Sequence, residues 1–299
     1  MEEVIKLETI DQYNQLYGLE TLHPLVTVVD LSEATRFPAR ATLNFGVYAL
    51  YLKQTRCGDL RYGKQIYDYQ EGTVTSFAPG QVVGIQMEDG VRPQSYGLVF
   101  HPDLIRGTSL GREIKHYSFF AYDSHEALHL SDEEKGIFRD CLDKIRLELA
   151  HPVDKHSKRL ISRNIELLLD YCMRFYERQF VTRAKANKDI LMKFEDLLDA
   201  YFQTDRPQTE GLPSVKYFAD GVHLSSNYFG DLVKKETGRT AQEYIQNKLI
   251  DLAKEEIIGS GKSVSEIAYR LGFQYPQHFT RVFKKNVGYT PTEYRELQV

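Results

Sequence analysis

The chain has 299 residues, of which 42% are hydrophobic, and it carries a formal net charge of −4 at pH 7. This length leaves room for two domains with ordinary cores, and no apolar run is long enough to span a membrane. The acidic start, Met1-Glu2-Glu3, is unlike a secretory signal, and three scattered cysteines are typical of a reducing compartment, so we expect a cytoplasmic protein.

The first third of the chain predicts β-structure. Residues 41–53 alternate between two faces, and further short runs follow at 76–77, 82–86 and 96–100. Glycine and proline separate these runs, a spacing that is typical of a sandwich or barrel. The alternation places on one face Leu43, Phe45, Val47, Ala49 and Tyr51.

Several tyrosines in this region, with a nearby arginine, would suit a pocket for a small organic ligand. The candidate ligand-binding residues are Tyr48, Tyr51, Tyr67 and Arg40. The alternative is that the tyrosines fill the core and that the arginine is solvated at the surface.

One motif favours a different class of protein. His125-Glu126-Ala127-Leu128-His129 matches H-E-x-x-H, the helical zinc signature of metalloproteases. That chemistry requires both imidazoles on one helical face, with the glutamate as general base. Ser131 and Glu134 form a capping box, however, which predicts that the helix begins only after His129. We therefore expect no enzyme activity, no bound metal and no other cofactor, and keep the metalloprotease as the alternative.

Two long helices with wide apolar stripes are predicted at 132–149 and 155–180. The width of the stripes favours contact on more than one side, so we expect a homodimer that forms through residues 131–184. Packing of both helices against the β-structure of the same chain is the alternative. A linker is expected after the second helix, at 182–188.

The last 86 residues contain one motif written twice, and Ser214-Val215 recurs 49 positions later as Ser263-Val264. Internal repetition of this kind determines the architecture. Each copy has the caps and apolar spacing of a short helix, a tight turn and a second helix. The copies therefore predict two helix-turn-helix units, at 214–238 and 263–288, and a further helix is expected between them at 240–258.

A helix-turn-helix unit places the start of its second helix against base edges, while flanking residues hold phosphates. Arg and Gln suit bidentate contacts with guanine and adenine, whereas Gly230 and Asp231 do not, so the second copy should dominate base reading. The candidate base-contacting residues are Ser226, Asn227, Pro276, Gln277, Thr280 and Arg281. The candidate phosphate-contacting residues, which include a Lys-Lys pair in each copy, are Ser225, Lys234, Lys235, Arg239, Lys284 and Lys285.

The helix between the two units predicts how far apart they lie. Nineteen residues at about 1.5 Å each make a rod of roughly 28 Å, which approaches the roughly 34 Å repeat of a DNA turn. Residues 211–299 carry 12 Lys and Arg against 10 Asp and Glu, a weak excess for phosphate neutralisation. Tight binding to DNA is therefore expected to need both units and two chains.

The run at 272–295, GFQYPQHFTRVFKKNVGYTPTEYR, resembles the C-terminal signature of the AraC/XylS family of bacterial transcription regulators. The resemblance implies a seven-helix domain at 185–299 that binds double-stranded DNA, with its first helix at about 189–202. This family commonly places a cupin-like sensor before that domain. Residues 71–80, EGTVTSFAPG, resemble the turn-and-strand passage of cupin barrels.

The expected fold class is α+β: a cupin-like β-barrel at 1–130, a helix pair at 131–184 and an all-α domain with two helix-turn-helix motifs. The expected function is sequence-specific transcription regulation, controlled by a small-molecule effector in the barrel, with RNA polymerase as a candidate partner. The alternative keeps the DNA-binding role but makes the barrel a dimerisation or protein-docking module without a ligand.

Overall fold

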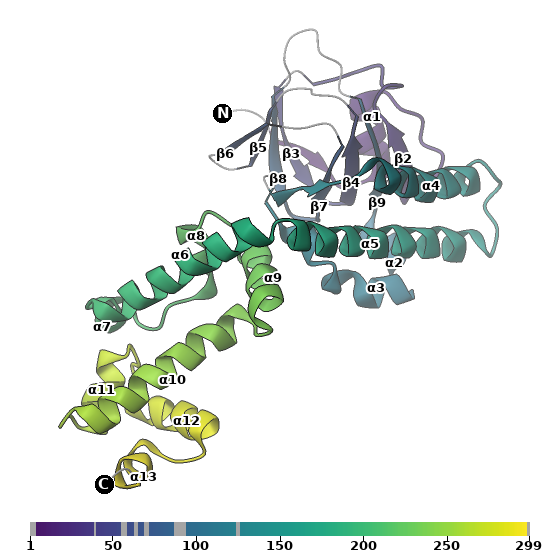
Figure 1. Ribbon diagram of the computed structural model, residues 1–299. Helices are drawn as coiled ribbons and strands as arrows, with labels where there is room; N and C mark the ends of the chain where they lie inside the picture. Colours follow the sequence, from purple (N-terminus) through teal and green to yellow (C-terminus); the bar gives the residue numbers. More distant parts are fainter. Residues whose placement is uncertain are drawn as a thin grey trace. The chain divides into compact units, whose positions relative to one another are not determined.

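The computed structural model describes residues 4–38, 40–54, 59–62, 65–68, 72–86, 94–123 and 126–297. The chain divides between Thr182 and Arg183 into two compact units (Figure 1). We name them the N-terminal unit and the C-terminal unit. Helices and sheets are both present, and the described residues of the C-terminal unit form helices and their connections alone.

The N-terminal unit contains two five-stranded sheets, with strand orders β1-β3-β8-β5-β6 and β10-β7-β4-β9-β2. Strands β1 and β3 run parallel, and the other described pairs are antiparallel. Neither sheet closes on itself among the described strands, so the expected closed barrel is not confirmed. The strands are β1 Val4–Leu7, β2 Val26–Asp30, β3 Arg40–Phe45, β4 Tyr48–Lys53, β5 Asp59–Tyr62, β6 Gln65–Asp68, β7 Thr73–Phe77, β8 Val82–Gln86, β9 Ser95–Phe100 and β10 Leu128–His129.

The alternating run at 41–53 folds as two strands that belong to different sheets. The chain turns between them at Gly46, where a Cβ atom would lie 3.0 Å from the Cα atom of Glu8. A larger residue would therefore crowd the segment that follows β1. The predicted apolar face nevertheless remains intact, because its members share one core between the two sheets: Leu43, Phe45, Val47, Ala49 and Tyr51.

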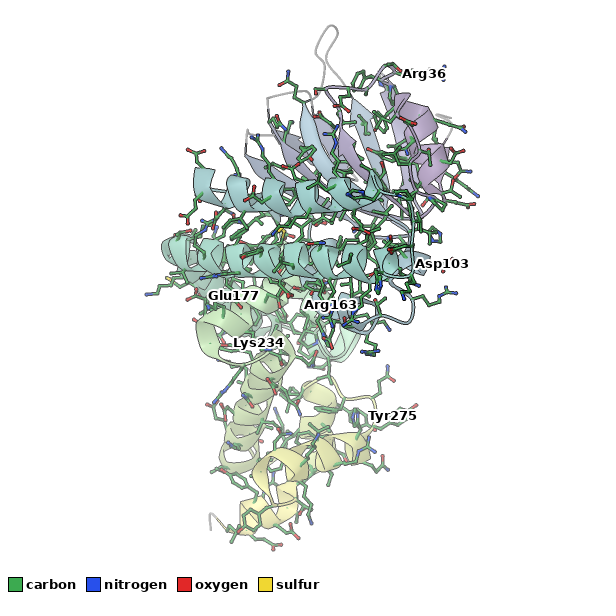
Figure 2. The ribbon with its side chains drawn as sticks, turned by 90° about the vertical axis from the view of Figure 1, so that its right-hand side faces the viewer. Arg36, Asp103, Arg163, Glu177, Lys234 and Tyr275 are labelled. Carbon is green, nitrogen blue, oxygen red and sulfur yellow. The ribbon has the colours of Figure 1, made fainter. Side chains whose placement is uncertain are left out.

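The helix pair belongs to the N-terminal unit. Helix α4 packs on α5 and on strands β2 and β9, and α5 also contacts β10 (Figure 1). Figure 2 shows Arg163 and Glu177 on the side of α5 that faces away from the sheets. Helix α4 has the predicted bounds, and α5 is shifted by two residues from its prediction. The helices of this unit are α1 Ile10–Tyr17, α2 Pro102–Ile105, α3 Ser109–Glu113, α4 Asp132–Leu149 and α5 Ser157–Thr182, with 3-10 turns at Ile114–His116 and Ser118–Ala121.

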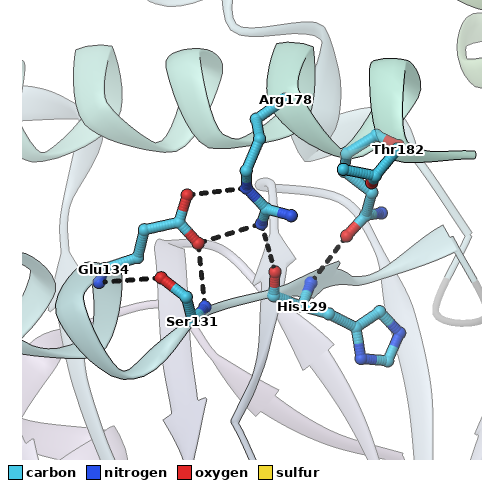
Figure 3. A network of polar contacts seen from close by, with 6 residues as sticks. His129, Ser131, Glu134, Arg178 and Thr182 are labelled. Atoms are coloured by element: carbon cyan, nitrogen blue, oxygen red, sulfur yellow. Dashed lines mark hydrogen bonds and ion pairs between the residues drawn. The ribbon is translucent and has the colours of Figure 1, made fainter.

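A polar network fastens the start of α4 and the strand β10 to the end of α5 (Figure 3). Ser131 and Glu134 form the predicted capping box at the start of α4. The Nε atom of Arg178 donates to Glu134 at 2.7 Å, and the same guanidinium donates to the carbonyl oxygen of His129 at 2.6 Å. The backbone N–H of His129 donates to Gln179 at 2.8 Å. Because Glu134 is largely buried, removal of Arg178 would leave its carboxyl group without this ion-pair partner.

The C-terminal unit begins with a longer helix than the sequence predicts. Helix α6 starts at Ala184, so the linker expected at 182–188 is mostly helical. The polar stretch at 203–213 also contains a short helix, α7. The helices of this unit are α6 Ala184–Gln203, α7 Arg206–Glu210, α8 Val215–Gly221, α9 Ser226–Thr237, α10 Ala241–Gly259, α11 Val264–Arg270, α12 Pro276–Val287 and α13 Pro291–Glu296.

Helix α10 is shared between two hydrophobic cores. Its first half contributes Ala241 and Ile245 to a core formed with α6, α8 and α9. Its second half contributes Leu249, Ala253 and other residues to a core formed with α11 and α12. Phe202, at the end of α6, packs against both cores. The two copies of the repeat are therefore held at opposite ends of one rigid element (Figure 1).

The turn of each copy contains one residue in the left-handed region. In the first copy this residue is His223, with φ of 61°, and in the second it is Gly272, with φ of 95°. The next residue makes the same backbone hydrogen bond in both copies, at 2.9 Å. The N–H of Leu224 donates to the carbonyl oxygen of Ala219, and the N–H of Phe273 donates to the corresponding carbonyl oxygen of α11. Left-handed backbone is strained for a residue with a Cβ atom, so the first copy stores strain that the second avoids.

We expect His223→Gly to raise the free energy of unfolding by about 0.5–1 kcal/mol, because relief of left-handed strain exceeds the extra chain entropy of glycine. Urea unfolding of the full chain measures this change. Gly272→Ala is the matched control and should be destabilising, because a Cβ atom there would lie 2.8 Å from the backbone of Gly211. A loss of stability in His223→Gly would contradict the strain at this turn.

Candidate nucleic-acid interface

The two copies present second helices of equal length, α9 and α12, with 12 residues each. The hydroxyl oxygen of Ser225 accepts a hydrogen bond from the backbone N–H of Tyr228 and so caps α9. Helix α12 has Pro276 in its first turn instead of a side-chain cap. Both helices end at a glycine with left-handed dihedral angles, Gly238 and Gly288, which satisfies their last carbonyl groups.

The predicted base-contacting residues lie on the solvent side of these helices. Asn227, Gln277 and Arg281 are exposed. The buried side of α12 is formed by Phe279 and Phe283, both at 0% exposure. The polar residues are three and four positions apart, so the structure brings them together on one face of α12.

The remaining base-contacting candidates are half-buried: Ser226, Pro276 and Thr280. The hydroxyl of Thr280 donates to the carbonyl oxygen of Pro276 at 3.1 Å. Its hydrogen is therefore engaged within the helix, and its oxygen is left as an acceptor. Gly230 and Asp231, which occupy the positions of the first copy that are equivalent to Thr280 and Arg281, are also half-buried.

The predicted phosphate-contacting cations are exposed in the last turns of α9 and α12 and just beyond α9: Lys234, Lys235, Arg239, Lys284 and Lys285. Lysines in a last turn also balance the negative end of the helix dipole. The hydroxyl of Ser225, the remaining candidate, serves as the cap of α9.

The cations also act on acidic residues of the following helices. Backbone and side-chain hydrogen bonds from Thr240 lower the pKa of Glu243, and the nearby charges of Arg239 and Lys234 lower it further. In the second copy, hydrogen bonds from Thr290 lower the pKa of Glu293, with a smaller contribution from Lys284. Part of the positive potential is therefore offset within each copy.

Three exposed tyrosines of the second copy were not predicted as contact residues. Tyr269, Tyr275 and Tyr289 have exposed fractions of 53%, 67% and 49%. Tyr275 immediately precedes α12, at the position where the first copy has Ser225. A tyrosine hydroxyl beside a recognition helix can donate to a phosphate oxygen. Alignment of the two copies of the repeat could have identified Tyr275 as a candidate contact residue, because it places this tyrosine opposite Ser225.

The structure does not bring together Tyr48 and Tyr51, two of the predicted ligand-binding residues. Tyr48 and Tyr51 lie on opposite faces of β4, because three positions separate them. The ring of Tyr48 stacks on Phe100 at 5.0 Å, whereas the ring of Tyr51 lies in the core, 6.4 Å from that of Tyr13. Arg40 is exposed at the start of β3, and the side chain of Tyr67 lies outside the described residues.

The described residues of the H-E-x-x-H motif, 126–129, do not lie on an α-helix. His129 lies on β10 and pairs with Thr73 of β7, and Glu126 is buried and accepts from the backbone N–H of Asp123 at 2.7 Å. His125 lies outside the described residues. Within the described residues, no three or more His, Cys, Asp and Glu side chains gather as metal ligands would. The spacing thus lacks the helical geometry on which zinc catalysis depends.

The described helices include none with both the length and the apolar composition needed to cross a bilayer.

Residues 218–297 match the model of a helix-turn-helix domain family. The uncharacterized transcriptional regulatory protein YesN of Bacillus subtilis is 39% identical over 88 residues, which cover 28% of this chain and 24% of that protein. The HTH-type transcriptional activator RhaS of Escherichia coli is 32% identical over 78 residues, which cover 26% of this chain and 28% of that protein.

Two solved structures are also similar to this chain. The C-terminal domain of the two-component response regulator yesN from Fusobacterium nucleatum is 26% identical, with a TM-score of 0.30, and the match covers 34% of this chain and 96% of that one. A transcriptional regulator of the AraC-type DNA-binding domain-containing proteins, from Chromobacterium violaceum, is 20% identical, with a TM-score of 0.32, and the match covers 38% of this chain and 94% of that one.

The chain spans between 14% and 47% of the length of the first three curated relatives it matches. The family match at 218–297 includes the run at 272–295 that carries the sequence resemblance. The resemblance is thereby confirmed for the C-terminal unit, whose residues 218–297 form a helix-turn-helix domain of the AraC/XylS type.

Proposed function

We propose that the chain is a cytoplasmic, sequence-specific regulator of transcription that binds double-stranded DNA and has no catalytic role. The observation that carries this proposal is the repeated surface of the C-terminal unit. Each second helix has polar side chains at its start and a lysine pair in its last turn, and α10 holds the two helices at its ends. The naming of the curated relatives as transcriptional regulators supports it.

We assign different tasks to the two copies. Gln277 and Arg281 of α12 are exposed and have the donors and acceptors that read base edges in the major groove. The corresponding face of α9 carries Asn227, Gly230 and Asp231, of which only Asn227 suits a bidentate contact with a base. The second copy therefore selects the sequence, while the first mainly holds the backbone of the adjacent groove.

The N-terminal unit is proposed to have a cupin-like architecture, because its two sheets enclose a common core. We further propose that it controls the DNA-binding unit, through a small-molecule effector or through dimerisation. The aromatic packing around Tyr51 favours a solid core over a ligand pocket at that position. Tyr13 and Tyr17 of α1 pack into the same core, with ring centroids 5.0 Å apart.

Arg281→Ala should lower the affinity for the preferred DNA site by about 1–3 kcal/mol and relax the preference at one base position, because a bidentate contact to a base is lost. Selection from a randomised DNA library with the full chain measures both effects. Arg281→Lys is the matched control, since it keeps the charge but loses the fork of donors. An unchanged base preference in both variants would exclude Arg281 from base reading.

Lys285→Ala should weaken binding to all DNA sequences alike and reduce the slope of log affinity against log salt by roughly one unit, because one phosphate contact disappears. Titration of a fluorescent duplex at several salt concentrations measures the slope. Lys193→Ala on α6 provides the control, as an exposed lysine outside both repeats, and should leave the slope unchanged. Equal slopes for Lys285→Ala and the unaltered chain would contradict the phosphate contact.

A homodimer through the helix pair is supported by exposed apolar side chains. Leu160 and Leu167 are seven residues apart on α5, with exposed fractions of 47% and 39%, so they share one helix face. We expect light scattering to find a dimer at micromolar concentration and a monomer for the double variant Leu160→Asp, Leu167→Asp. Leu22→Asp, at an exposed leucine outside the pair, should stay dimeric. Monomer alone for the unaltered chain would exclude this dimer.

A further inference from the structure

A basic pocket lies on the N-terminal unit, between α5 and the loop that joins α2 to α3. Its volume is about 530 Å³, which is within the range of small-molecule sites. Among the described residues that line it, none is acidic. Its five cationic side chains are Arg106, Lys155, Lys158, Arg159 and Arg163.

The spacing of these residues explains why they meet. Four of the cations lie within nine residues of the sequence, at 155–163: Lys155 just before α5, and the other three in its first two turns. Within the helix, the interval of four residues places Arg159 and Arg163 on one side. The fifth, Arg106, follows α2, which packs on α5 together with α3 (Figure 1).

Some of these charges are already engaged. Arg106 pairs with Asp103 at 2.9 Å, and Arg163 pairs with Glu166 at 2.8 Å. Lys158 donates to the carbonyl oxygen of Arg106 at 3.1 Å. Lys155 and Arg159, by contrast, have no ion-pair or hydrogen-bond partner in the part of the chain that the structure describes. The pocket therefore has a positive charge that its own surroundings do not neutralise.

A buried hydroxyl in the same pocket also lacks a partner. Ser162 is only 3% exposed, and its Oγ atom makes no hydrogen bond among the described residues. The other two hydroxyls that line the pocket are engaged: Thr108 donates to a backbone carbonyl at 2.6 Å, and Ser109 donates to Glu166 at 3.1 Å. A buried polar group without a partner is uncommon in folded proteins and calls for an explanation.

We propose that this pocket binds a small polyanion of the phosphate class, such as a phosphorylated metabolite. Unpaired Arg159 and Lys155 supply charge-assisted hydrogen bonds to its oxygens, and the arginine fork matches phosphate geometry. The hydroxyl of Ser162 donates to a further oxygen. This site is distinct from the interior of the sheets, and its ligand binding does not depend on the DNA-binding role.

Two neighbouring possibilities fit the residues less well. An adjoining pocket shares Arg159 and Arg163 but is also lined by Glu148 and Asp154, whose charges repel an anion. A DNA duplex could contact the exposed cations, but its backbone is too broad to reach a hydroxyl as buried as that of Ser162. The combination of free cations with a buried donor favours a small ligand.

The test is calorimetric titration of the full chain, without DNA, with inorganic pyrophosphate at fixed ionic strength. We expect one site per chain and an affinity about tenfold lower for Arg159→Ala, the equivalent of one charge-assisted hydrogen bond. Arg139→Ala, at an exposed arginine of α4, is the matched control and should bind like the unaltered chain. An equal loss in both variants would show general charge attraction and overturn the proposal, as would the absence of binding.

Ser162→Ala separates a ligand contact from a structural role. Thermal unfolding without pyrophosphate should occur at the same or a higher temperature, because an unsatisfied buried hydroxyl is removed. The increase in unfolding temperature that pyrophosphate causes should become smaller. An undiminished increase would remove Ser162 from the site. If a duplex competes with pyrophosphate and Arg159→Ala weakens only the duplex, the surface is a nucleic-acid contact and the proposal is wrong.

Discussion

The C-terminal unit depends on one constraint, which is the division of α10 between two hydrophobic cores. Ile245 and Leu249 are one helical turn apart, yet they belong to different cores. Because an α-helix resists bending, the orientation of the first motif determines that of the second. Phe202 adds a second link, since it packs against both cores. A flexible linker could not keep the second helices of the two motifs in a fixed relation, so the proposed binding of DNA by both motifs depends on the burial of α10.

The electrostatics of this unit favour the proposed difference between the motifs, in which the second reads bases and the first mainly contacts the DNA backbone. The net excess of positive charge at 211–299 is small, and capping residues such as Glu243 and Glu293 offset some of it close to the lysine pairs. Affinity from phosphate contacts alone is therefore modest. The proposed function therefore requires base contacts and simultaneous engagement of both motifs. The exposed tyrosines around α12 offer the proposed interface hydroxyl donors that carry no charge.

Local signals in the sequence predicted much of this fold. The capping box predicted at Ser131 is present in the structure, because it depends on residues only three positions apart. The same local pattern of residues explains the capping boxes at Thr240, Ser263 and Thr290. The bend at Gly46 was missed, because the apolar face continues through it while the strand changes sheet. Likewise, Arg106 and Arg159 are more than fifty residues apart, and only the packing of α2 and α3 on α5 brings them together.

The N-terminal unit has a filled interior, and its basic pocket lies elsewhere, at the surface of α5. Its interior is filled by aromatic side chains such as Tyr13, Tyr51 and Phe77, and a ligand that entered there would have to displace well-packed rings. The basic pocket lies outside the sheets and needs no such rearrangement. It is formed by α5, the helix that also carries the exposed leucines and the arginine of the network at β10. A polyanion that draws the loop after α2 toward α5 would therefore act directly on the element that we propose as the dimer contact, without any change in the core.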